Sequence, residues 1–189
     1  MPRSALLFIF MATLALSGGC ATPRIDLAVA SHSNVNPDHS GRPSPVIVKI
    51  YEMRSDLAFK QSDFIPLFMT PVQVLGADLL AVDELVLVPG EARRITYEPA
   101  EKTRFLGILA GFRQMERAAW KTVTPIDSGT ENTVGIELTD TTLALVAADT
   151  AAGWDPAEAV KSFQKSAEAA DTGSGDLGYY LPEPKRLAQ

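Results

Sequence analysis

Few residues of this chain have the types and spacing that metal binding requires. The two histidines, His32 and His39, lie with Asp38 in one stretch rich in proline and asparagine, where they could be imagined as metal ligands. Zinc sites draw on cysteine and histidine ligands at characteristic spacings. This stretch offers no cysteine and no i,i+4 pair of ligands. We therefore expect two solvated loop histidines and no metal site.

The acidic residues give no better support to catalysis. Asp78, Asp83 and Glu84 could suit a hydrolase or a calcium site, but the Asp-x-Asp-x-Asp-Gly pattern of calcium loops is absent. A solvated edge is the simpler interpretation. Gly107 and Gly111 lie inside one apolar run, which does not indicate a phosphate-binding loop but allows close approach of another layer. Because no nucleophile stands beside a base, we predict that the protein is not an enzyme and has no cofactor.

Cys20 is the only cysteine, and the residues before it suggest its role. Residues 5–16 form an apolar run that is too short to span a bilayer and is typical of a signal peptide. Small side chains then precede Cys20 as in a bacterial lipobox, although Ser17 stands where the usual lipobox has leucine. We predict a signal peptide at residues 1–19 and covalent diacylglycerol and N-acyl lipid on Cys20. The alternative is an ordinary secretory signal that ends near a free cysteine.

The residue after Cys20 indicates the membrane in which the protein is anchored, and the composition limits the class of partner. Ala21 replaces the aspartate that would mean inner-membrane retention in enteric bacteria, so we expect a lipid anchor in the outer membrane, facing the periplasm. The chain has 17 basic and 23 acidic residues, a net charge of −6, and no basic cluster. This pattern argues against nucleic acid as a partner. With Cys20 lipidated the fold has no disulfide, so apolar burial must hold it together.

Eight short stretches have the composition and alternation of β-strands. Turn residues separate them, and such regular spacing is typical of an antiparallel β-sandwich. Pro89 and Gly90 are expected to close a hairpin between the third and fourth strands. The predicted strands are residues 24–30, 46–51, 85–88, 93–98, 105–112, 118–123, 133–138 and 142–146.

Two helices are predicted beside the strands. A short inserted helix covers residues 62–68, with Ser62 as its N-cap. A C-terminal helix follows the capping signals at 155–158 and places Val160, Phe163 and Ala167 on one stripe. Trp154 is expected to dock this helix onto the sheet. The predicted organisation is a lipidated N-terminus and β-sandwich domain at 20–150, a C-terminal helix at 151–170 and a flexible tail at 171–189.

Residues 31–45 are expected to form a long loop. Three prolines, a glycine and two asparagines leave no room there for a regular element. Long ordered loops inside compact domains are uncommon and often functional. This loop is therefore the first candidate for a binding site.

Several phrases, in order and at similar spacing over residues 20–146, resemble the outer-membrane lipoprotein of the type VI secretion system, the TssJ family. Singly each phrase is weak, but an ordered set that follows a lipobox is fairly specific. The phrases are Asn34-Val-Asn-Pro37, Gly41 to Tyr51, Leu57 with Phe59, Ser62 to Phe68, Gly76 to Leu80, Leu87 to Glu91, and Phe105 to Phe112 followed by Arg113 and Trp120.

The resemblance implies a transthyretin-like β-sandwich with a small helical addition and no enzymatic activity. Members of the family bind the periplasmic C-terminal region of TssM, which with TssL forms the complex that anchors the secretion machine. The loop between the first two strands contributes to that contact, which here implies residues 31–45. The best contact candidates are then Asn34, Asn36, Pro37, Arg42 and Pro43.

A second hypothesis is a periplasmic lipoprotein whose sandwich binds a carbohydrate or another small ligand. It predicts exposed aromatic side chains over a concave face. Trp120, Tyr97 and Phe112 buried in the core would count against it.

Overall fold

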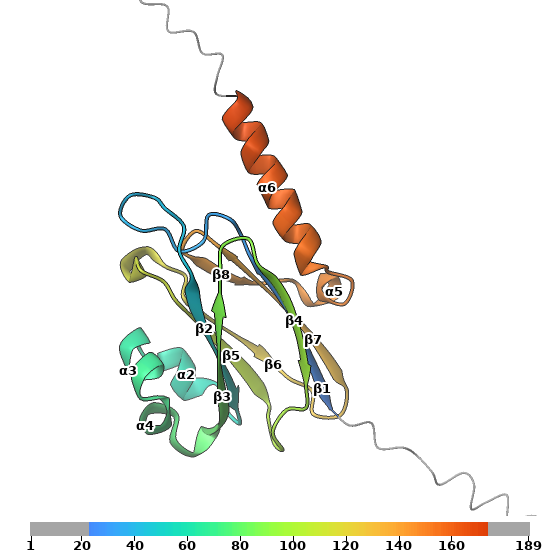
Figure 1. The fold of residues 1–189 in the computed structure, drawn as a ribbon. Helices are drawn as coiled ribbons and strands as arrows, with labels where there is room; N and C mark the ends of the chain where they lie inside the picture. The colour runs from blue at the N-terminus through green and yellow to red at the C-terminus, as the bar shows by residue number, and fades with distance from the viewer. Residues whose placement is uncertain (1–22, 174–189) are drawn as a thin grey trace, which may run out of the picture.

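The structure, a computed structural model, describes residues 23–173. The predicted signal peptide, Cys20 and most of the predicted tail lie outside the described residues. Eight strands form two four-stranded sheets that pack face to face, as Figure 1 shows. The strands are β1 (Arg24–Ser31), β2 (Val46–Met53), β3 (Leu79–Leu87), β4 (Ala92–Tyr97), β5 (Phe105–Gly111), β6 (Lys121–Pro125), β7 (Glu131–Thr139) and β8 (Thr142–Leu145).

The two sheets have the strand orders β4-β1-β7-β8 and β3-β2-β5-β6. All neighbouring strands are antiparallel except β1 and β7, which are parallel. The predicted mostly-β sandwich is confirmed, but the predicted hairpin is wrong. β3 pairs with β2 and β4 pairs with β1, so the turn at Pro89 and Gly90 carries the chain from one sheet to the other. At the opposite edge, a parallel bridge between Ala119 and Thr142 joins the sheets.

Alternation along the strands builds the core between the sheets. In β1 the inward side chains are Ile25, Leu27 and Val29, and each is fully buried. They meet Val48 and Ile50 of β2 in one apolar cluster. Burial of such side chains drives folding, because each removes a large apolar area from water.

The β3-β2-β5-β6 sheet carries a helical insertion on its outer face (Figure 1). The insertion is larger than the single helix predicted, because it contains α2 (Leu57–Gln61), α3 (Phe64–Met69), α4 (Pro71–Leu75) and a 3-10 turn, η1 (Gly76–Asp78). Ser62 does not cap a helix start: it follows the last residue of α2, and its hydroxyl donates to the Ala58 carbonyl of that helix (2.7 Å). The predicted close approach at Gly107 is real, since a Cβ there would lie 2.7 Å from Cε of Met53 and 2.9 Å from Cζ of Phe59.

Two further helices, α5 (Ala148–Ala151) and α6 (Pro156–Gly173), follow the last strand. α6 packs on β1 and β4 of the other sheet and extends beyond the sandwich (Figure 1). Of its predicted stripe, Val160 is buried, Phe163 is half-buried and Ala167 is exposed. Trp154 contacts the sheet as expected, because a Cβ on Gly135 would lie 3.2 Å from its ring. In the described part of the chain, none of the helices has the length and apolarity needed to cross a membrane.

Candidate partner-binding site

The candidate site lies at the end of the sandwich where β1 finishes. The β1–β2 loop, residues 32–45, projects there, at the opposite end of β1 from Pro23 (Figure 1). Hydrogen bonds across its base give it a defined shape: the amide of Asn36 donates to the Asp140 carbonyl (2.7 Å) and that of Ser44 to the Val35 carbonyl (3.2 Å). The loop therefore presents a surface of defined shape.

Asn36 is the residue that fixes the base of the loop. It is 2% exposed and adopts a left-handed conformation with φ of 51°, which asparagine tolerates better than most residues. Its Nδ2 donates to the Pro45 carbonyl (2.6 Å), and its Oδ1 accepts from the amide of Arg113 (2.7 Å). Its carbonyl accepts from the Ser44 hydroxyl (2.5 Å). The bond from Arg113 ties the loop to the connection between β5 and β6, and the other two close the loop on itself.

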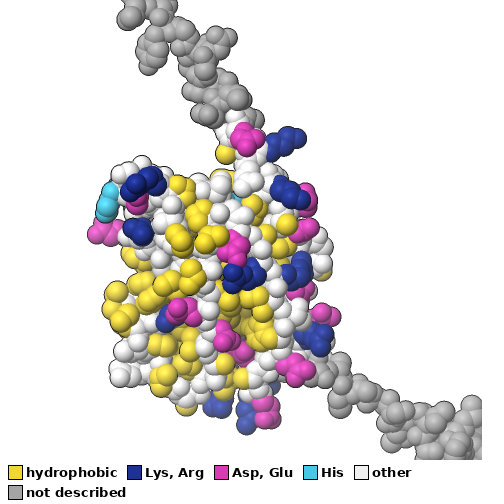
Figure 2. Space-filling model, in the orientation of Figure 1, with side chains coloured by type: hydrophobic (Ala, Val, Ile, Leu, Met, Phe, Trp, Pro, Cys, Tyr) yellow, Lys and Arg dark blue, Asp and Glu magenta, His cyan; other side chains and the backbone are white. Residues whose placement is uncertain are grey.

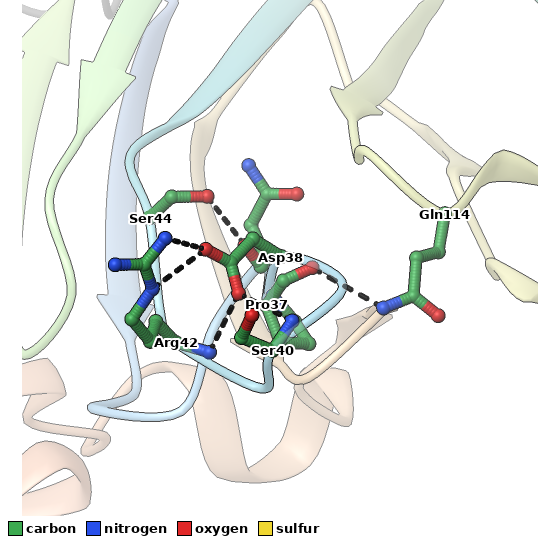
Figure 3. Close-up of polar contacts among 7 residues, drawn as sticks. Pro37, Asp38, Ser40, Arg42, Ser44 and Gln114 are labelled. Atoms are coloured by element: carbon green, nitrogen blue, oxygen red, sulfur yellow. Dashed lines mark hydrogen bonds and ion pairs between the residues drawn. The ribbon is translucent and has the colours of Figure 1, made fainter.

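The tip of the loop is organised around Asp38, as Figure 3 shows. One carboxylate oxygen accepts from the amides of Ser40 (2.8 Å) and Arg42 (3.0 Å), and the other accepts from Nε of Arg42 (2.9 Å). These hydrogen bonds lower the pKa of Asp38 to about 2. The bond from the Arg42 amide has the largest effect, and that from the Arg42 side chain is second. The tip is thus a charged turn whose bonds persist at any physiological pH.

The five predicted contact residues divide into two groups. Asn34, Arg42 and Pro43 are exposed, and the Arg42 side chain keeps 79% of its surface free beside Asp38. Pro37 is half-buried and its carbonyl accepts from Nε2 of Gln114 (3.2 Å). Asn36 is enclosed, so in this arrangement it shapes the loop from within. A contact role for any of the five remains a prediction.

The prediction for His32 is wrong, because this side chain is buried. It is 2% exposed, its Nε2 lies 2.6 Å from Oε1 of Glu137, and its ring centroid lies 4.3 Å from that of Phe163 in α6. The sequence held a signal for this: His32 continues the alternation of Ala28 and Ala30 on the outer face of β1. His39, in contrast, is exposed at the tip as expected.

The sequence reasoning missed a hollow beside the loop, of about 490 Å³. It lies between His39 of the β1–β2 loop and the β5–β6 connection, residues 112–120, which contains the 3-10 turn η2 (Met115–Arg117). The sequence feature that could have indicated this hollow is the pair of arginines, Arg113 and Arg117, between two predicted strands. The residues that line the hollow are His39, Arg113, Gln114, Met115, Glu116 and Arg117.

The carboxylates that were considered as a site lie at an edge. Asp83 and Glu84 are exposed on β3, the edge strand of its sheet, and Glu84 pairs with Lys49 (3.4 Å). Among residues 23–173 no three His, Cys, Asp or Glu side chains gather closely enough to hold a metal ion.

Comparison with known proteins agrees with this reading of the fold. The sequence profile of the family described as "Type VI secretion lipoprotein, VasD, EvfM, TssJ, VC_A0113" matches residues 23–141, more than half of the chain. The crystal structure of the T6SS lipoprotein TssJ1 from Pseudomonas aeruginosa is 32% identical, with a TM-score of 0.65, covering 67% of this chain and 97% of that one. No curated protein matches the sequence.

Two more distant structures share the fold. Serratia marcescens Lip, described as a membrane-bound component of the type VI secretion system, is 23% identical with a TM-score of 0.61, covering 67% of this chain and 98% of that one. A chain of the structure described as "T6SS protein TssM C-terminal domain (869-1107) from EAEC" is 22% identical with a TM-score of 0.56, covering 66% and 98%.

A two-sheet β-sandwich with a helical insertion and an ordered loop at one end is the fold of the type VI secretion lipoproteins that match this chain. The chain belongs to the type VI secretion lipoprotein family, TssJ. It is accordingly a membrane-bound lipoprotein of the outer-membrane TssJ family and serves a structural role in type VI secretion.

Proposed function

We propose that this lipoprotein docks the periplasmic C-terminal region of TssM and thereby anchors the type VI secretion membrane complex, of which TssL is part, at the outer membrane. In this proposal residues 1–19 are removed, and lipid on Cys20 holds the mature protein to the membrane. Mass spectrometry of the mature N-terminal peptide tests the anchor, and a peptide without the mass of the lipid would contradict it. The likeness to a chain of the TssM C-terminal domain structure supports the choice of partner.

The observation that carries the proposal is the separation of the two ends of β1. The strand has eight residues, and at about 3.3 Å per residue it spans roughly 26 Å. Cys20 lies three residues before Pro23, at the start of β1, whereas the β1–β2 loop lies at its far end. A lipid at the first end leaves the loop directed away from the membrane, toward a partner that rises from the inner membrane.

The order within the loop also supports a binding role. A loop already held in shape loses little conformational freedom when it binds, so less of the interaction energy is lost to ordering. Here Asn36 fixes the base and Asp38 fixes the tip, while Arg42 stays exposed. Arginine is enriched at protein interfaces and often dominates their binding energy.

The carbohydrate alternative gains no support from the aromatic side chains on which it depended. Phe112 is 3% exposed. Tyr97 and Trp120 are half-buried and pack against the core. They line no exposed aromatic face of the kind that sugar binding requires.

The test is binding of the cognate TssM C-terminal region to the mature protein with residues 38–43 replaced by a Gly/Ser turn. The whole loop should not be replaced, because Val35 and Asn36 are buried and their loss would disturb the core. We expect the tip variant to keep the thermal unfolding midpoint of the wild type within a few degrees and to lose at least about tenfold in affinity. Isothermal titration calorimetry and circular dichroism measure the two quantities.

The matched control replaces the exposed residues Asp127 to Thr130, in the β6–β7 turn, by the same kind of linker. It should bind TssM as the wild type does. Failure of the wild type to bind would overturn the proposed function. Full binding by the tip variant would overturn only the assignment of the loop.

A further inference from the structure

The hollow beside the β1–β2 loop has two walls and a floor. His39 contributes one wall, and Arg113 to Arg117 contribute the other. Met115 is half-buried and packs against the core, so it supplies an apolar floor under polar walls. Figure 2 shows basic, acidic and histidine side chains gathered at the corner of the molecule where the loop lies.

The two walls are joined as one rigid unit. The amide of Arg113 donates to Oδ1 of Asn36 (2.7 Å), and Nε2 of Gln114 donates to the Pro37 carbonyl (3.2 Å; Figure 3). Within the second wall, the Arg117 amide donates to the Gln114 carbonyl (3.3 Å). A partner that contacts the loop therefore has the β5–β6 connection directly beside it.

The charges of the hollow differ from those of the chain. The protein has a net charge of −6, yet the lining holds two arginines and only one carboxylate, Glu116. Arg113 and Arg117 are exposed, and their guanidinium groups make no ion pair or hydrogen bond within residues 23–173. Several other arginines are already paired, as Arg42 is with Asp38 and Arg94 with Asp26 (2.5 Å).

We propose that this hollow is a second half of the docking site and receives an acidic segment of the TssM periplasmic region. The proposal rests on the proposed function, because it assumes that the adjoining loop contacts TssM. A guanidinium binds a carboxylate through two parallel hydrogen bonds, and two guanidinium groups on one short connection favour a segment that carries Asp or Glu. The floor at Met115 accommodates an apolar side chain beside the acidic ones. Complementary charge of this kind speeds association and fixes the register of the two partners.

The experiment measures binding of the mature protein to the cognate TssM C-terminal region at low and high ionic strength. The variant Arg113→Glu/Arg117→Glu should raise the dissociation constant about tenfold or more at low salt, with a smaller difference at high salt because screening weakens exposed charge pairs. The conservative variant Arg113→Lys/Arg117→Lys keeps the charge and should lose about threefold at most, since lysine cannot make the bidentate contact. The matched control, Lys102→Glu, changes an exposed cation in the β4–β5 loop at the other end of the sandwich.

The outcomes separate the two proposals. If the wild type does not bind TssM, both fail. If the wild type binds and the Glu variant binds equally well, the hollow is not part of the site, while the proposed function stands. A loss of the same size in Lys102→Glu would mean that net charge alone matters and would also overturn the inference. If the Glu variant does not fold, the neutral Arg113→Gln/Arg117→Gln variant decides by the same comparison.

Discussion

The two outer faces of the sandwich are covered in different ways. The face of the β3-β2-β5-β6 sheet meets three short helices through large apolar side chains. The face of the β4-β1-β7-β8 sheet meets one long helix, α6, over small residues of β1 and through a ring contact between Phe163 and the buried His32. The first covering behaves as part of the core, whereas the second lies on a sandwich that is already complete.

The helical insertion is held by large side chains from both partners. Tyr51, Met53 and Leu109 point outward from the sheet and meet three residues of the helices, and all six are at most 4% exposed. The residues from the helices are Phe59, Leu67 and Leu75. Lys121 adds a polar anchor, because its ammonium group donates to the carbonyls of Phe59 (3.0 Å), Lys60 (2.8 Å) and Ser62 (2.7 Å) at the end of α2.

The contact surface under α6 is much flatter. Ala28 and Ala30 of β1 point outward and are fully buried, which leaves room for a helix to lie close to the strand. Among residues 156–168 of α6 only Pro156 and Val160 are buried, Phe163 is half-buried on the His32 ring, and residues 164–168 are exposed. The family profile ends at residue 141, before β8 and α6, and includes the insertion. We infer that α6 can detach without loss of the sandwich, whereas the insertion cannot.

Phe59→Ala gives the largest expected effect. Phe59 is 1% exposed and packs against Tyr51 with ring centroids 5.3 Å apart. Truncation of a buried phenylalanine leaves a cavity and typically costs about 3–5 kcal/mol of unfolding free energy. Denaturant titration should show this loss in one cooperative transition for the whole domain. The control Val72→Ala, at a side chain 68% exposed in the same insertion, should change the free energy by less than about 0.5 kcal/mol. A separate early transition for the insertion would contradict its place in the core.

Phe163→Ala tests the other covering and should have a smaller effect. The side chain contacts His32 but is only half-buried, so its removal should lower the global unfolding free energy by about 1 kcal/mol or less. Local opening of α6 should increase more, because few apolar contacts hold this helix. Hydrogen exchange measured by mass spectrometry reports the two separately. Faster exchange in β1 and β7 as well as in α6 would show that the helix is integral after all; Lys165→Ala, at an exposed position, is the control.

The strands could be predicted from the sequence because their signal is local. Alternation of Ile25, Leu27 and Val29 identifies β1 regardless of its neighbours. The pairing of strands is not local: Pro89 and Gly90 correctly indicate a turn, but a turn does not state whether the chain returns to the same sheet. β4 finds its partner in β1, more than sixty positions earlier, as the pairing of Val29 with Arg93 shows. The residues of a turn therefore cannot indicate which distant strand the chain will pair with.

Only part of the candidate site could be predicted from the sequence, again because local signals are readable and long-range contacts are not. Composition located the loop, since prolines and asparagines exclude regular structure. It could not distinguish Asn36, which is enclosed, from Asn34, which is exposed, because the difference depends on a hydrogen bond from Arg113, 77 positions away. The hollow at the β5–β6 connection depends on the same bond. His32 was missed because Phe163, which covers it, comes from α6.

The smallest expected effect compares two tyrosines whose hydroxyl groups are buried. The Tyr51 hydroxyl donates to the Leu67 carbonyl of α3 (3.0 Å) and so pins the insertion to its sheet, whereas that of Tyr97 finds no partner among residues 23–173. Removal of a satisfied buried hydrogen bond costs about 1 kcal/mol. At pH 7 we therefore expect Tyr51→Phe to lower the unfolding free energy by about that amount, and Tyr97→Phe to leave it unchanged or raise it slightly.

The two variants should behave alike only in alkali. Burial raises the pKa of both tyrosines above the usual value of 10. Between pH 10 and the raised pKa the unfolded chain has lost these protons and the folded chain keeps them, so the unfolding free energy of the wild type falls as the pH rises. Each Phe variant removes one of the two groups and should show a shallower fall in denaturant titrations from pH 9 to pH 11. Equal losses for both variants at pH 7 would mean that the bond from Tyr51 to α3 does not stabilise the insertion, and the contrast between the two coverings would then rest on apolar packing alone.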